Sequence, residues 1–278
     1  MSPIRTLQQR YWFSPQFPFL ECRSTWQSQQ PYKVHSHAQL SVGCLERGST
    51  QCRVGEQTYL LNAGDVVVIP PDLPHSCNPL PGQSRSYHML YLDASWCHRE
   101  HVRNTGLRKL PDGDIVTYRS SSLSQLVMQI IHCLHASELE HVERDLLRLF
   151  AALFQPPSVW EMNVDAPSRS NVARHVQQRL LENLQDAPSL TVLAHELAMR
   201  PETLVRHFRQ ETGMTPMAYL NNARVEHAKR LIRQGETLAD TGYTCGFSDQ
   251  SHFHRTFVNF TAATPGQYRQ ARSIFHNK

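Results

Sequence analysis

The chain has 278 residues, about twice the length of a usual domain, which favours two domains that each bury a core. Seven cysteines without CxxC pairing argue against a disulfide framework and against a four-cysteine zinc site. The sequence has no run of about 18 apolar residues and no signal-peptide pattern at its start, so we expect a cytoplasmic protein with no membrane segment.

The net charge of +4 is distributed unevenly along the chain. Residues 1–168 contain 14 Lys and Arg against 15 Asp and Glu, whereas residues 169–278 contain 14 against 9. An excess of five positive charges indicates an anionic partner such as nucleic acid, although an ordinary solvated surface has the same excess.

Residues from about 20 to 95 have the pattern of an all-β unit. Short alternating or β-branched runs at 38–48, 50–61 and 65–70 are separated by the turn sequences RGS, VGEQ and NAGD. We therefore expect an N-terminal domain made of strands, with bounds 1–105.

The period then changes to that of helices. Apolar residues recur at three and four positions between Leu123 and Leu134, and again between Leu146 and Leu153. The first stripe either packs on the strands of its own chain or forms a dimer seam. A linker rich in proline and polar residues follows, and we divide the remainder into a helical dimerisation or linker region, 106–168, and a helical domain, 169–278.

The helical domain begins with a predicted helix-turn-helix. Ser189 or Thr191 caps a short helix, Ala198 forms the turn, and Pro201 starts a second helix that ends at Gly213. On that second helix the apolar side chains at 204 and 208 face inward, so the opposite face presents the polar side chains of Glu202, Arg206 and Arg209.

A second motif repeats this plan. A short helix ends near Gly246, and Ser248 or Asp249 caps the next helix, whose phenylalanines at 253, 257 and 260 form one inward face. The outward strip consists of Gln250, Ser251, His254 and Arg255. Arginine can read guanine and glutamine can read adenine in a major groove, which has the width of a helix.

The helix that joins the two motifs is predicted from Thr215, a cap, to about Arg233. Its 18 or so residues span roughly 27 Å, close to the 34 Å of one DNA turn, so one chain can place two helices in successive major grooves. His252 and His254 lie about 200° apart on their helix, which excludes their joint binding of one metal.

Two segments, GMTPMAYLNNARVEHAKRLI and GYTCGFSDQSHFHRTFVNFTAATPGQYR, resemble the double helix-turn-helix domain of the AraC/XylS family of bacterial transcription regulators. The resemblance covers about the last 100 residues. It implies base contacts from the first motif's helix and from the second's, at the positions Glu202, Val205, Arg206, Gln250, Ser251, His254 and Arg255. Arg200 departs from the family pattern, which usually has a serine or a similar cap there.

The N-terminal domain contains VHSHAQLSVG and, further on, NAGDVVVIPPDLPHSCNP. Alternation along a strand would direct His35, His37 and Gln39 to one face, and a closed sheet would bring His75 beside them. These segments resemble the cupin barrel that many AraC-type regulators carry as a sensing domain. The expected fold class is therefore α+β multidomain: a cupin-like β-barrel with flanking helices, followed by an all-α double helix-turn-helix domain.

Three uses of this cluster stay open. His35, His37 and His75 either bind a divalent transition metal, or line a polar pocket with Gln39 for an organic effector, or serve structure alone. Metal-binding cupins normally supply a carboxylate where this chain has Gln39. Cys77 either faces the same cavity or belongs to the packed core.

The leading hypothesis is a transcription regulator and not an enzyme, because no nucleophile–base pair and no phosphate loop is present. Its expected partners are promoter DNA, a small-molecule effector, RNA polymerase and a second copy of the chain. The alternative is a metal-dependent cupin enzyme with a helical appendage.

Overall fold

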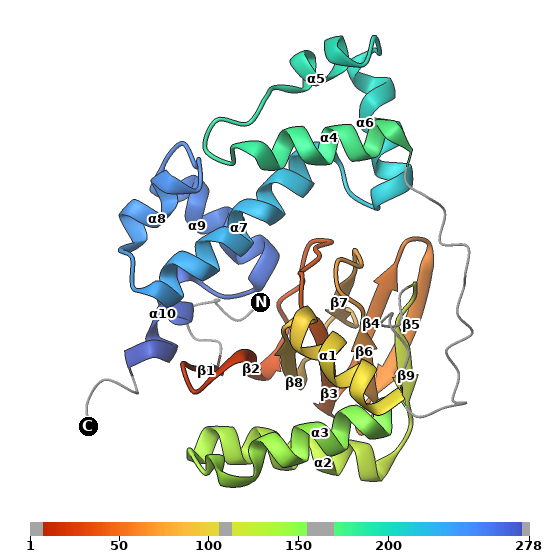
Figure 1. The fold of residues 1–278 in the computed structure, drawn as a ribbon, viewed down its shortest axis with the longest axis vertical. Helices are drawn as coiled ribbons and strands as arrows, with labels where there is room; N and C mark the ends of the chain where they lie inside the picture. Colours follow the sequence, from red (N-terminus) through yellow and green to blue (C-terminus); the bar gives the residue numbers. More distant parts are fainter. Residues whose placement is uncertain (1–7, 106–112, 155–169, 274–278) are drawn as a thin grey trace. The chain divides into compact units, whose positions relative to one another are not determined.

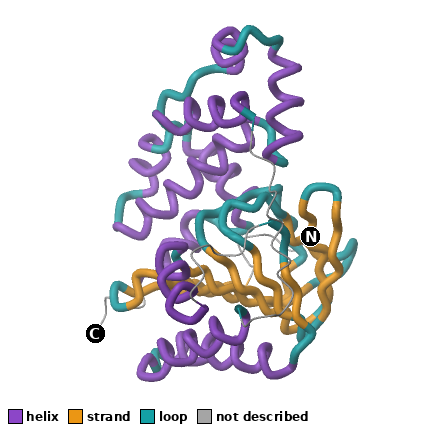
Figure 2. Tube along the Cα trace, turned by 45° about the vertical axis from the view of Figure 1, so that its right-hand side comes forward, coloured by secondary structure: helices purple, strands orange, loops and turns teal. Residues whose placement is uncertain are grey.

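The computed structural model describes residues 8–105, 113–154 and 170–273. Their contacts form two compact units, one containing most of the residues of the N-terminal half and the other containing the C-terminal helices. The main division falls between residues 164 and 165, outside the described residues, as does the predicted boundary at Ser168; the short segments 31–36 and 74–76 are grouped with the C-terminal helices. Strands occur in the N-terminal unit, whereas the described elements of the C-terminal region are all helices (Figure 2).

The N-terminal unit is built on two sheets; the pairs of the larger sheet and the β4–β5 pair of the smaller one are antiparallel. The larger one has the order β1-β2-β8-β3-β6-β9, and the smaller one has the order β5-β4-β7. The strands of the larger sheet are β1 (Gln8–Ser14), β2 (Phe17–Ser28), β8 (Arg85–Leu92), β3 (Leu40–Arg47), β6 (Val66–Ile69) and β9 (Val116–Tyr118). Those of the smaller sheet are β5 (Gln57–Asn62), β4 (Ser49–Val54) and β7 (Ser76–Pro79). The three strand segments predicted between residues 38 and 70 are thus confirmed as β3, the β4–β5 hairpin and β6.

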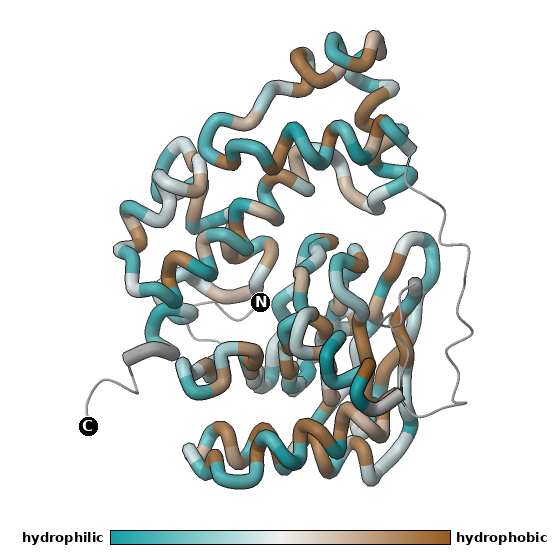
Figure 3. The backbone as a smooth tube through the Cα atoms, viewed as in Figure 1, coloured by the Kyte–Doolittle hydropathy of each residue, from teal (hydrophilic) through white to brown (hydrophobic). Residues whose placement is uncertain are grey.

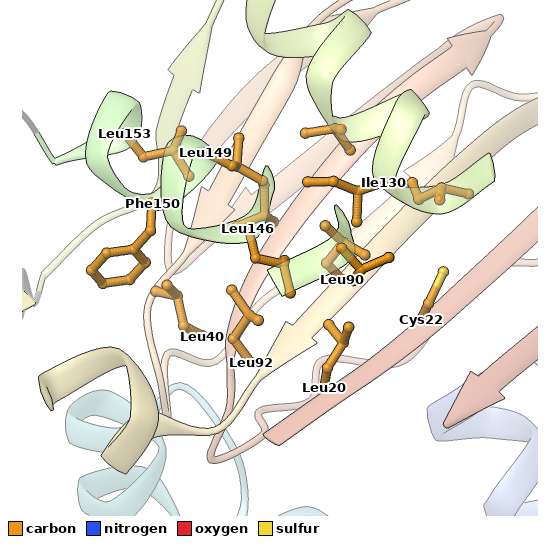
Figure 4. Close-up of a cluster of buried hydrophobic side chains, with 14 of the residues drawn as sticks. Leu20, Cys22, Leu40, Leu90, Leu92, Ile130, Leu146, Leu149, Phe150 and Leu153 are labelled. Carbon is orange, nitrogen blue, oxygen red and sulfur yellow. The ribbon is translucent and has the colours of Figure 1, made fainter. Parts of the chain in front are cut away.

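One face of the larger sheet is a continuous apolar ladder. Cys22 lies opposite Leu90, Leu90 lies opposite Val42, and Val42 lies opposite Val68. Residues paired directly across neighbouring strands point to the same side of a sheet, so these four side chains share one face. This face packs against two helices, α2 (Ser121–Ala136) and α3 (Val142–Leu153), as Figures 1 and 4 show. Figure 3 shows hydrophobic residues recurring along both helices between hydrophilic ones.

The helical stripe of residues 123–134 therefore packs on the sheet of its own chain, which is the first of the two alternatives. Val127, Ile130, Ile131 and Leu134 belong to the same buried core as the strand residues. On α2 the Ser120 side chain caps the first turn, and Ser137 ends the helix in a left-handed conformation.

Two elements of this unit are not expected from the sequence. Helix α1 (Ala94–Thr105) follows β8, and β9 pairs with β6 inside residues 106–168, predicted as a helical dimerisation or linker region. The Tyr118 hydroxyl of β9 donates to the Leu153 carbonyl of α3 at 2.8 Å. Residues 116–153 thus share one core with the strands and do not form a separate helical segment. A short 3₁₀ turn, Leu139–His141, links α2 to α3.

The C-terminal unit consists of helices on which small residues and caps set the boundaries. They are α4 (Asn171–Glu182), α5 (Leu190–Glu196), α6 (Pro201–Thr212), α7 (Pro216–Gln234), α8 (Leu238–Thr244), α9 (Gln250–Thr261) and α10 (Pro265–Ser273). The predicted caps are Ser189 for α5, Thr215 for α7 and Asp249 for α9, and each accepts a hydrogen bond from the first turn of its helix. Within the described residues, no helix combines the length and apolarity needed to cross a membrane.

Candidate functional site

The C-terminal unit contains one structural motif twice. Helices α6 and α9 begin 49 residues apart, have the same length, and end on threonines with matching hydrogen bonds. Thr212 donates to the carbonyl of Phe208 at 2.7 Å, and Thr261 donates to the carbonyl of Phe257 at 2.7 Å. A Thr-Pro pair then starts the next helix in both halves. We call α6 and α9 the recognition helices.

The predicted polar faces of the recognition helices are largely exposed. Glu202, Arg206 and Arg209 of α6 are exposed, and Val205 is half-buried. On α9, Ser251 and Arg255 are exposed and His254 is half-buried, while the three phenylalanines 253, 257 and 260 are buried. Arg206 and Arg255 occupy corresponding positions, 49 residues apart, so the duplicated motif presents one guanidinium group twice.

Gln250 has a partner within the domain. Its side-chain amide donates to the carbonyl oxygens of Leu238 and Ala239, both at 3.2 Å, and so ties the start of α9 to the start of α8. Base reading by Gln250 stays a prediction, and it requires these two hydrogen bonds to be exchanged for hydrogen bonds to a base.

The two recognition helices begin differently. The Asp249 carboxylate accepts from the backbone N–H of His252 at 2.8 Å, and this bond, with one from Ser248, lowers the pKa of Asp249. Arg200 occupies the N-cap position of α6 and makes no side-chain cap hydrogen bond. Because Arg200 stands where the family usually has a serine or a similar cap, the first turn of α6 lacks the side-chain cap that α9 has.

The predicted histidine cluster is present, but its backbone differs from the prediction. His35, His37 and Gln39 precede β3 in a segment that is not a strand, and only a single bridge pairs His35 with His75. The prediction that alternation along a strand directs His35, His37 and Gln39 to one face is therefore wrong. The backbone N–H of Asp72 donates to the His37 carbonyl at 2.8 Å, and His35 and His75 exchange two backbone hydrogen bonds of 2.9 Å.

The side chains of His35, His37 and His75 come together as predicted. One ring nitrogen of each lies within 4.8 Å of those of the other two. The Nδ1 atoms of His35 and His37 lie 2.8 Å and 3.0 Å from the carbonyl oxygens of Lys33 and Gln39. An Nδ1–H that donates to a carbonyl leaves Nε2 with its lone pair, which is the arrangement found in metal-ligating histidines.

The side-chain Oε1 of Gln39 is buried and has no hydrogen-bond partner among the described residues. The Ser41 hydroxyl lies 3.2 Å from Nε2 of His37. The sulfur of Cys77 contacts that of Cys52, and the residue is partly exposed, so both of its predicted environments stay open.

Two buried arginines near this region are not anticipated from the sequence. The guanidinium of Arg23 lies 5.7 Å from the centre of the Tyr87 ring, and that of Arg85 lies 4.9 Å from it. Arg85 also donates to the Cys77 carbonyl at 2.6 Å and so links the two sheets. An arginine on a strand is ordinarily assigned to the solvent face, which is why the pattern did not indicate these residues.

A buried polar network lies where the sheet meets α2. The Ser24 hydroxyl lies 2.7 Å from His135 Nε2 and 2.8 Å from His88 Nδ1. Burial lowers the pKa of both histidines, that of His135 to about 4, so both rings are neutral at neutral pH. This network joins three elements of the core, β2, β8 and α2.

Comparison with known proteins finds a family match in each of the two parts of the chain. A family described as AraC-like ligand binding domain matches residues 18–154, and one described as helix-turn-helix domain matches residues 193–271. The HTH-type transcriptional regulator YbfI of Bacillus subtilis is 27% identical over 226 residues, which are 80% of this chain and 82% of that protein. The HTH-type transcriptional activator RhaS of Escherichia coli is 30% identical over 161 residues, 55% of this chain and 57% of RhaS.

Solved structures of ToxT from Vibrio cholerae share the fold. An apo form superimposes with a TM-score of 0.60 at 13% identity and covers 91% of this chain and 97% of that one. A form with unsaturated fatty acid bound gives a TM-score of 0.55 at 15% identity and covers 97% of both chains. The expected fold class, a sheet-containing sensor domain followed by a helical DNA-binding domain, is confirmed. The chain belongs to the AraC/XylS family of transcription regulators, with an N-terminal ligand-binding domain and a C-terminal helix-turn-helix domain that binds DNA.

Proposed function

We propose that α6 and α9 enter successive major grooves of promoter DNA and read bases there. The observation that carries this proposal is the repetition of an exposed arginine, Arg206 and Arg255, at corresponding positions of the two helices. Helix α7, which joins the two motifs, has 19 residues and is about 28 Å long, close to the repeat of the duplex.

The test compares Arg255→Ala with Arg99→Ala, which removes the same charge from an exposed position on α1. A binding site is first selected from random duplexes with the unaltered protein, and affinity is then measured by gel shift on this site and on random DNA. Arg255→Ala is expected to cost about 1–3 kcal/mol on the selected site and far less on random DNA. Equal losses on both kinds of DNA would assign Arg255 to the phosphates, and no loss would contradict the proposal.

We further propose that His35, His37, Gln39 and His75 bind the effector that controls DNA binding. The convergence of three imidazoles supports this proposal, and so does the buried Oε1 of Gln39, which has no hydrogen-bond partner among the described residues. The Nδ1 atoms of His35 and His37 face carbonyl oxygens, which fits a divalent transition metal as well. Such a metal would be held by one ring nitrogen from each of the three histidines, and it would polarise a bound effector group. The absence of a carboxylate from this group favours a binding role over an enzymatic one.

Metal content decides between the two forms of this proposal. Purified full-length protein is titrated with zinc or cobalt and analysed for bound metal, alongside His75→Ala and the control His98→Ala, an exposed histidine on α1. About one metal per chain is expected, with loss in His75→Ala only. Equal metal content in all three proteins would assign the metal elsewhere, and no metal in any would leave the organic effector as the ligand.

Two further partners are part of the proposal: RNA polymerase at the promoter and a second copy of the chain. A homodimer would use a surface other than the apolar stripe of α2, which the chain's own sheet covers. Sedimentation of the free protein and of its complex with DNA measures the number of chains. The proposed location is the cytoplasm, where promoter DNA is accessible.

A further inference from the structure

Two cysteines of the N-terminal unit lie in contact on neighbouring strands of the smaller sheet. Cys52 is on β4 and Cys77 is on β7, and their sulfur atoms are 3.0 Å apart. Cys52 is completely buried, whereas Cys77 is partly exposed. Part of residue Cys77 is therefore open to solvent, whereas no part of Cys52 is.

The surrounding hydrogen bonds hold the two strands in place. The Thr50 hydroxyl on β4 donates to the Asn78 carbonyl on β7 at 2.9 Å, and Arg85 donates to the carbonyl of Cys77. Neighbouring strands lie about 4.7–4.9 Å apart, which is within the Cα separation of about 4.4–6.8 Å that a disulfide spans. The sulfur atoms must approach by about 1 Å to reach the disulfide bond length of about 2.05 Å, a movement that side-chain rotation supplies.

We propose that Cys52 and Cys77 form an oxidation site that hydrogen peroxide converts to a disulfide. In the first step the Cys77 thiolate attacks one oxygen of peroxide, the O–O bond breaks, and hydroxide leaves and is protonated to water. Cys77 is then a sulfenic acid. Cys52 attacks the sulfur of Cys77, the S–O bond breaks, and the oxygen leaves as a second water with the thiol proton of Cys52.

The two sulfur atoms thus lose two electrons to one peroxide, and two water molecules are formed. The product joins β4 to β7, the strand that begins directly after His75. This inference does not depend on the role of the histidines, because it concerns the two sulfur atoms alone.

The test uses the full-length protein, reduced and then freed of reductant, with hydrogen peroxide as the probe. Peptide mapping by mass spectrometry without reduction is expected to show one peptide pair joined through Cys52 and Cys77, lighter by two hydrogens and released by dithiothreitol. Thiol titration is expected to show the loss of two thiols per chain.

Three variants separate this proposal from general thiol oxidation. Cys77→Ser is expected to retain its Cys52 thiol under the same treatment, because that sulfur is buried. Cys52→Ser is expected to accumulate a sulfenic acid at Cys77 that dimedone traps. The control Cys133→Ser, which removes another partly exposed cysteine, is expected to behave like the unaltered protein.

A cross-link from Cys77 to Cys133, a cross-link between chains, or unchanged thiol loss in Cys77→Ser would overturn the proposal. If a serine variant does not fold, the peptide map of the unaltered protein still decides, because a map without the joined Cys52–Cys77 peptides contradicts it directly.

Discussion

The two helix-turn-helix motifs share one backbone plan and differ in the residues that meet its constraints. In the first motif Ala198 occupies the turn with a φ of 51°, and in the second Gly246 occupies it with a φ of 79°. The hydrogen bonds that close the turns correspond: Met199 N–H donates to Ala194, and Phe247 N–H donates to Gly242. The same turn thus tolerates a side chain in one motif and not in the other, for a reason that lies outside the turn.

That reason is the loop after α4. A Cβ added at Gly246 would lie 2.5 Å from the carbonyl oxygen of Leu184 and 2.7 Å from Cα of Gln185. Backbone atoms cannot yield as the end of a flexible side chain can. The two turns have similar backbone geometry, but packing against a distant loop determines which residue each turn accepts.

The largest expected effect follows from this contrast. Gly246→Ala combines a left-handed backbone with a backbone clash, so we expect a loss of roughly 3 kcal/mol or more in the stability of the C-terminal unit. The matched variant Ala198→Gly relieves backbone strain but raises the entropy of the unfolded chain, and these effects oppose each other, so we expect a change below about 1 kcal/mol. Scanning calorimetry measures both, and equal changes would show that the loop after α4 is not the cause.

The second prediction compares the two arginines on DNA. Arg206→Ala and Arg255→Ala are each expected to weaken binding to the selected site by about 1–3 kcal/mol. If the recognition helices lie in separate grooves, the losses should add within about 0.5 kcal/mol in the double variant, because distant sites act independently. Gel-shift titration of the four proteins forms the cycle, and strong coupling would place the two arginines on one short stretch of DNA.

The sequence predicts the elements of this unit well because its signals are local. The caps Ser189, Thr215 and Asp249 and the glycine after α8 act within a few residues, so each boundary can be read from its neighbours. The contact between Gly246 and Leu184 depends on packing across the chain, and the pattern of residues 244–250 does not contain it.

The N-terminal unit shows the same limit more clearly. The sequence predicts that His75 approaches His35, and the structure shows this contact as a single bridge. The strand on which the prediction is based does not form. The contact of Cys52 with Cys77, and the burial of Arg23 and Arg85, depend on the pairing of distant strands. Three residues of β9 are too few to give an alternating pattern.

The third prediction exchanges the caps of the recognition helices. Arg200→Ser is expected to stabilise the C-terminal unit by about 0.5–1 kcal/mol, because a serine hydroxyl can accept from a first-turn N–H of α6 that lacks such a partner. Asp249→Ala is expected to lower the unfolding midpoint by a few degrees, because α9 loses its bond from His252. Calorimetry at neutral pH checks both variants, and a change of the same sign in both would contradict the capping explanation.

The smallest effect concerns an ion cluster that ties the first motif to α4. Glu196 of α5 accepts from Arg179 at 2.8 Å and lies 2.9 Å from His175, both on α4, and these hydrogen bonds lower the pKa of Glu196 to about 2. A carboxylate with a lowered folded-state pKa stabilises the fold fully above its unfolded pKa of about 4.5 and loses that contribution as the pH falls towards 2. Because the cluster is exposed, we expect only a small destabilisation by Glu196→Gln at pH 7.

The sign of this pH dependence separates the ion cluster from simple packing. The difference in unfolding midpoint between Glu196→Gln and the unaltered protein should shrink steadily from pH 5 to pH 3. Protonation of Glu196 weakens its charged hydrogen bonds in the unaltered protein, and the variant lacks these at every pH. Glu236→Gln, at an exposed carboxylate after α7, is the matched control and should show little difference at any pH. A difference for Glu196→Gln that stays constant down to pH 3 would mean that the side chain acts through its shape. The first motif would then be held to α4 by packing alone, and the second motif has no corresponding glutamate, since Thr244 occupies that position.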